Sequence, residues 1–129
     1  KLMWNGKKDK ARKIVYKSLK KLEEKTKQPA IDAFETIINN VKPLVEVRSK
    51  RIGGATYQVP VEVDLTRAQT LAMRWIIQAA RNKKGKPMVE KLTQELIAAY
   101  NKEGAAMKKR ENVHKMAEAN KAFAHFARF

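Results

Sequence analysis

Along most of this chain, apolar residues recur at spacings of three and four, the period that gives a helix one buried face. Five such stripes are present, over 11–22, 30–41, 71–79, 88–100 and 113–126. Residues 1–6 read as the last turn of an earlier helix that stops at Gly6. The pattern therefore predicts six helices, the first of them truncated, and we expect that an N-terminal segment precedes the sequence.

Residues 44–63 depart from this pattern and predict a β-ribbon. Apolar and polar residues alternate over 44–48 and 57–63, which is the period of a strand with two different faces. The basic tip between them contains Gly53-Gly54, which suits a tight hairpin turn. A two-stranded ribbon is marginal by itself in water, so its base must lean on helices while its tip projects. The expected fold is mainly α, a six-helix bundle-like body in one domain over 1–129, with the ribbon between the third and fourth helices.

Local signals mark where several helices begin. Pro29 and Pro87 each suit the first position of a helix. The run Thr66-Arg67-Ala68-Gln69 resembles a capping box, which predicts a helix start at Thr66. The last helix is expected to begin near Ala106 and to continue through Phe126.

The charge balance indicates a polyanionic partner. The chain holds 29 Lys and Arg against 13 Asp and Glu, a formal net charge of +16. A compact body with this excess repels itself unless a polyanion neutralises it, and nucleic acid is the commonest one. An anionic membrane surface and a generally basic soluble protein are the alternatives. Residues 108–110 put three bases at the start of a helix, where positive charge is unfavourable, which suggests that they serve a partner.

The candidate nucleic-acid contacts are the clustered bases together with two glycines, a tyrosine and a histidine. Tyr57 either packs on the ribbon or stacks on a nucleotide, and Asn120 makes either a structural bond or a phosphate contact. The candidates for RNA binding are Lys7, Lys8, Lys10, Arg12, Arg48, Lys50, Arg51, Gly53, Gly54, Tyr57, Arg67, Arg74, Arg81, Lys83, Lys84, Lys86, Lys108, Lys109, Arg110, His114 and Lys115.

No catalytic or metal-binding arrangement is recognisable. The absence of cysteine excludes a disulfide framework, a thiolate zinc site and a cysteine nucleophile. His114 and His125 lie about 16 Å apart on one predicted helix and cannot share a metal. The acids are dispersed, so we expect neither an enzyme nor a cofactor, although an enzyme with an unrecognised site is an alternative. No apolar stretch approaches the length of a membrane span, and the cytosol is the default compartment.

Three long motifs resemble one family. Residues 43–61 (PLVEVRSKRIGGATYQVPV), 71–76 (LAMRWI) and 108–126 (KKRENVHKMAEANKAFAHF) resemble small-subunit ribosomal protein seven, the last in its bacterial and organellar form. The resemblance covers essentially the whole chain. What departs is the start, because the family's basic N-terminal arm and most of its first helix are absent here.

The resemblance implies a six-helix body with a protruding ribbon and binding to the 3′ major domain of small-subunit ribosomal RNA. It further implies early assembly of the subunit head, a position beside the exit-site transfer RNA and the messenger RNA path, and contact with ribosomal protein eleven and other head proteins. Some members also repress translation of their own messenger RNA. The expected location is the ribosome, in the cytoplasm or in an organelle, with no membrane partner. The alternative function is a DNA-bending architectural protein with a basic β-arm.

Overall fold

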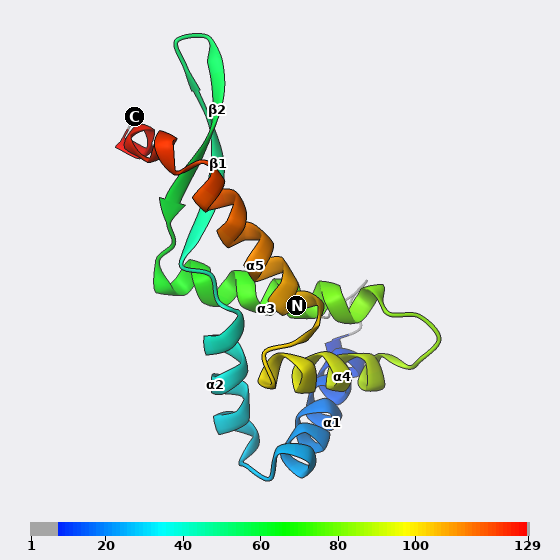
Figure 1. Ribbon diagram of the computed structural model, residues 1–129. Coiled ribbons are helices and arrows are strands. Elements are labelled where there is room, and N and C mark those ends of the chain that lie inside the picture. Colours follow the sequence, from blue (N-terminus) through cyan, green and yellow to red (C-terminus); the bar gives the residue numbers. More distant parts are fainter. Residues whose placement is uncertain (1–7, 129) are drawn as a thin grey trace.

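A computed structural model describes residues 8–128, and Figure 1 shows a helical body from which a ribbon of two strands projects. In chain order the elements are α1 (Lys8–Thr26), α2 (Ala30–Val41), β1 (Val45–Ile52), β2 (Ala55–Glu62), α3 (Leu65–Asn82), α4 (Met88–Tyr100), α5 (Gly104–Ala119) and the 3₁₀ helix η1 (Lys121–Arg128). The mainly helical fold with one antiparallel ribbon confirms the prediction. The truncated first helix expected at residues 1–6 lies outside the described residues, so the ribbon follows the second helix that the structure describes.

The predicted apolar stripes form the core of the body. Leu22, Ile37 and Val41 are fully buried, and Leu96 is nearly so. Helix α4 contacts α1, α2, α3 and α5, which makes it the central element of the packing. The ribbon lies outside this core and is supported at its base by α5, which contacts both strands.

The ribbon has no uniformly apolar face. Strands β1 and β2 pair along their lengths, and the register sets Arg48 opposite Val59 and Glu46 opposite Val61. Because directly opposite residues share a face, the apolar set of one strand lies beside the polar set of the other. Val59 is nevertheless fully buried, and η1, which contacts β2, lies beside the ribbon (Figure 1). One face of the ribbon therefore needs η1 to cover it.

The ribbon tip is a two-residue turn. Gly53 and Gly54 have φ angles of 59° and 84°, the left-handed values that a primed hairpin turn requires at both central residues. A Cβ atom at either position would meet nothing within 4 Å. Backbone conformation therefore explains the two glycines, and the open space around them leaves their backbone accessible.

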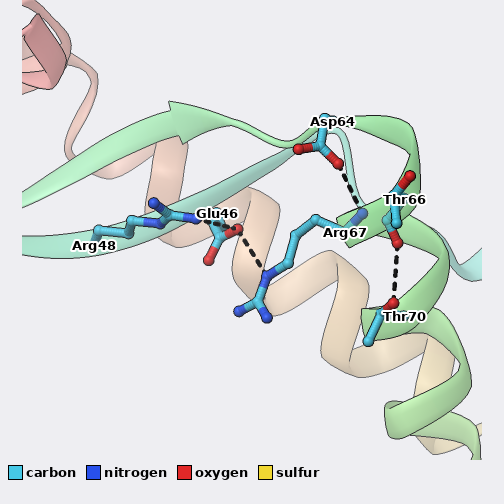
Figure 2. Close-up of polar contacts among 6 residues, drawn as sticks. All are labelled: Glu46, Arg48, Asp64, Thr66, Arg67 and Thr70. Carbon is cyan, nitrogen blue, oxygen red and sulfur yellow. Dashed lines mark hydrogen bonds and ion pairs between the residues drawn. The ribbon is translucent and has the colours of Figure 1, made fainter.

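The start of α3 corrects the predicted cap. The helix begins at Leu65 with Asp64 as its N-cap, and the Asp64 side chain accepts a hydrogen bond from the backbone N–H of Arg67 at 2.8 Å (Figure 2). The predicted cap, Thr66, lies inside the first turn. Asp64 caps the helix two positions before Thr66, because its side chain accepts a hydrogen bond from the backbone N–H three residues later.

The last predicted helix is in fact two elements. Helix α5 ends at Ala119, and the backbone N–H and side-chain amide of Asn120 both donate to the carbonyl of Met116. The chain then turns and continues as η1. A single helix through Phe126 is therefore wrong, because Asn120 closes the helix with the structural bond that was one of its two predicted roles. His114 and His125 consequently lie on different elements, and the distance expected from one continuous helix does not apply.

Candidate nucleic-acid interface

The bases of α1 form the first part of the candidate interface. Lys8, Lys10 and Arg12 are exposed in its first turns. Lys7 lies outside the described residues. This group is open to a ligand, since lysine and arginine heads remain in water unless they are paired.

Helix α3 carries a stripe of arginines. Arg67, Arg74 and Arg81 are seven residues apart, so each follows the last by almost two full turns and by about 10 Å. Arg74 is exposed, and the other two are half-buried. The connection after α3 adds Lys83, Lys84 and Lys86, and Lys83 lies about 24 Å from Arg67 by helix rise. In Figure 1 this connection lies at the end of α3 remote from the ribbon, so the basic residues extend along the whole of α3 and into the connection.

The predicted cations of the ribbon tip divide between its faces. Arg48 and Lys50 lie on the face of Tyr57, whereas Arg51 lies on the other face, since side chains alternate along a strand. Arg48 and Arg51 are exposed. Lys50 donates from Nζ to the carbonyl of Ala127 at 2.8 Å, which ties it to η1.

An acidic residue holds the base of the ribbon. The Glu46 carboxylate lies 3.4 Å from Arg67 Nε and 3.5 Å from a terminal nitrogen of Arg48 (Figure 2). The Glu46 side chain is only 13% exposed, so water screens the Glu46–Arg67 ion pair less than it screens an ion pair on the open surface. Arg67, predicted as an RNA contact, therefore also fixes β1 against α3.

Two candidates on α5 anchor the start of β1. Arg110 Nε donates to the carbonyl of Lys42 at 3.1 Å, and His114 Nε2 accepts a hydrogen bond from the backbone N–H of Leu44 at 3.1 Å. Burial and, secondarily, the positive charge of Arg110 lower the pKa of His114 below 6.5. The neutral ring with its proton on Nδ1 is the form that can accept this bond. The remaining candidates on α5, Lys108, Lys109 and Lys115, are exposed.

Acidification should loosen this anchor. Since the folded-state pKa of His114 lies below 6.5, the unfolded chain binds the proton more readily, so the stabilisation is complete above pH 6.5. It is lost as the pH falls below that value and through the lowered pKa. We expect the free energy of unfolding to fall by about 1 kcal/mol between pH 7.5 and pH 5.5, which is the contribution of one hydrogen bond. Urea unfolding at a series of pH values measures this change. His114→Asn should remove this slope, and an equal slope in that variant would contradict the assignment.

A buried carboxylate that the sequence does not reveal supports the start of α5. Glu95 on α4 is fully buried, and its Oε1 accepts from the backbone N–H of Ala106 at 2.9 Å. Its Oε2 lies 3.5 Å from Lys83 Nζ. A Cβ at Gly104, where φ is 92°, would come within 2.9 Å of Ala98 Cβ and 3.0 Å of Glu95 Oε1. The carboxylate lies at the N-terminus of α5, where negative charge is favourable. Residues 108–110, expected at the start of this helix, follow in its second turn, because α5 begins at Gly104. Lys83 has a structural partner in Glu95.

The helical body contains an apolar pocket. A pocket of about 500 Å³ between α1, α2, α3 and α4 is lined only by apolar side chains, Ile31, Phe34, Ile77 and Leu96 among them. Residues 8–128 contain no group of three His, Asp or Glu side chains that could hold a metal ion. In the same part of the chain, no helix has the length and hydropathy required to cross a membrane.

Comparison with known proteins gives one consistent result. The model of the family described as Ribosomal protein S7p/S5e matches residues 1–121. A small ribosomal subunit protein uS7 of Fervidobacterium nodosum is 64% identical over 98% of this chain and 81% of the relative. Proteins of the same name from Kosmotoga olearia and Thermosipho africanus are 63% and 60% identical, each over 97% of this chain and 81% of the relative.

Proposed function

This chain belongs to the ribosomal protein S7p/S5e family, and from that premise we propose that it is a structural component of the small ribosomal subunit that binds folded ribosomal RNA. The family is one of ribosomal proteins rather than enzymes. The observation that carries the proposal is the separation of exposed cations on α1, the ribbon, α3 and α5 by a packed helical core.

Separated cations favour a folded RNA over a single duplex. Side chains cannot read the deep, narrow groove of A-form RNA, so recognition rests on shape, phosphates and splayed bases. Arg67 and Lys83 are about 24 Å apart along α3, with Arg74 and Arg81 between them, and the ribbon tip projects in another direction (Figure 1). Only an RNA with several helices meeting at a junction can contact all these groups together. Because the protein binds only the folded junction, it stabilises that fold by mass action.

The finer part of the proposal follows from the family resemblance. The RNA is the 3′ major domain of small-subunit ribosomal RNA, and binding nucleates assembly of the subunit head. The protein lies in the cytoplasmic ribosome near the exit-site transfer RNA and the messenger RNA path, in contact with ribosomal protein eleven and other head proteins. Repression of its own messenger RNA is a further role that such a surface supports.

Competition between nucleic acids tests this function. The labelled RNA is a multi-helix junction of the 3′ major domain, and the competitors are an unrelated transcript of equal length and a DNA duplex of equal charge. We expect the junction to compete at least tenfold better than either at the same salt concentration. Equal competition by the unrelated transcript would refute junction recognition, and equal competition by duplex DNA would favour the architectural DNA-binding alternative.

A further inference from the structure

The C-terminal helix η1 lies against one face of the ribbon. After α5 the chain turns at Asn120, and Figure 1 shows the red C-terminal segment beside the strands. The ring of Tyr57 on β2 has its centroid 5.3 Å from that of Phe123 and 4.7 Å from that of Phe126. The two phenylalanine rings are stacked with centroids 6.1 Å apart. These spacings are those of favourable aromatic pairs, so η1 and β2 share one aromatic cluster.

The other strand is held at the same level. Lys50 is the cross-strand partner of Tyr57, and its Nζ donates to the carbonyl of Ala127 at 2.8 Å. Val59, on the same face and one step nearer the body, is fully buried. Only residues 51–56 extend beyond this level. Helix η1 therefore supports both strands almost to the tip of an element that would be marginal by itself.

We propose that η1 is a brace that holds the ribbon ready for RNA, and that Tyr57, Phe123 and Phe126 are positioning residues rather than stacking platforms for bases. This inference rests on the proposed RNA-binding function. A ribbon ordered before binding loses less conformational entropy when it meets the RNA, and this raises affinity without an added contact. Tyr57 was predicted either to pack or to stack on a nucleotide, and its ring already has two aromatic neighbours.

The test replaces both rings without changing charge. In the full chain, Phe123→Ala with Phe126→Ala should lower the hydrogen-exchange protection of ribbon amides 46–59 about tenfold, with protection in α2 and α4 unchanged. Affinity for the junction RNA should also fall about tenfold, whereas its salt dependence should stay the same because no cation is removed. Tyr57→Phe keeps the ring and should leave both measurements unchanged. Phe126→Leu keeps apolar bulk and should give intermediate losses of ribbon protection and RNA affinity. It is the variant to measure if the double variant fails to fold.

The possible outcomes separate this inference from the proposed function. Ribbon protection equal to that of the unsubstituted chain would overturn the brace. Weaker RNA binding with full ribbon protection would also overturn it, and would identify the rings as base-stacking contacts. If the unsubstituted chain shows no preference for the junction RNA, the proposed function fails, and exchange measured without RNA still decides whether η1 orders the ribbon.

Discussion

Raising the salt concentration from about 50 to 200 mM should weaken binding to the junction RNA by about a thousandfold, provided that about six phosphates are contacted. Each neutralised phosphate releases counterions, so the logarithm of the affinity falls linearly with the logarithm of the salt concentration. The described residues include more than six exposed candidate cations, on α1, the ribbon, α3 and α5. Filter binding at four or five salt concentrations measures the slope. A nearly flat response would contradict binding dominated by phosphates.

The ribbon's share of this slope can be measured separately. Arg48→Ala with Arg51→Ala removes two exposed cations. Lys50 is kept because it bonds to η1, so its removal could weaken RNA binding by loosening the ribbon as well as by losing a phosphate contact. The slope should decrease by about 2, while the midpoint of thermal unfolding stays within a few degrees. Lys25→Ala, an exposed base in the last turn of α1 outside the candidate set, is the matched control. A stability loss without a change of slope would mean that these arginines support the fold instead.

Glu95→Ala should damage folding more than the removal of any single surface charge, with a loss of about 3 kcal/mol in the free energy of unfolding. The change leaves the buried backbone N–H of Ala106 without its acceptor and removes the negative charge at the start of α5. It also opens a cavity between α4 and α5, because the carboxylate is fully buried. Chemical denaturation with urea measures the loss.

Two control variants separate these contributions. Glu95→Gln keeps an acceptor for Ala106 and should recover part of the stability. Lys83→Ala removes only the partner at 3.5 Å, whose side chain is 35% exposed, and should cost less than about 1 kcal/mol. If Lys83→Ala is as harmful as Glu95→Ala, the ion pair rather than the cap of α5 is what matters.

The sequence predicts which elements exist better than where they end. Apolar stripes and strand alternation are long signals, and each described helix and strand occurs where they fall. Helix ends depend on one or two side chains, so Asp64 displaced the expected cap at Thr66, and Asn120 divided the last helix. Both residues favour helix ends because their short polar side chains bond the nearby backbone.

For the candidate interface, the sequence predicts that most of its cations are exposed, but not which of them also hold the fold together. Exposure of lysine and arginine follows from their cost of burial, and most candidates in the described part of the chain are exposed. The partners of Lys50, Arg67, Arg110 and Lys83 lie far away in sequence, and only the packed structure brings them together. For the same reason no local pattern predicts that Glu95 is buried and bonded to Ala106, since in the sequence it resembles any other acidic residue of a helix.

The opposed directions of Arg48 and Arg51 limit how a ligand can meet the ribbon. The two residues are about 10 Å apart along one strand and lie on opposite faces. A flat surface laid against the ribbon could satisfy one of them and would leave the other in solvent. An RNA that contacts both arginines must therefore reach both faces of the ribbon, and on the face of Arg48 it must pass beside η1.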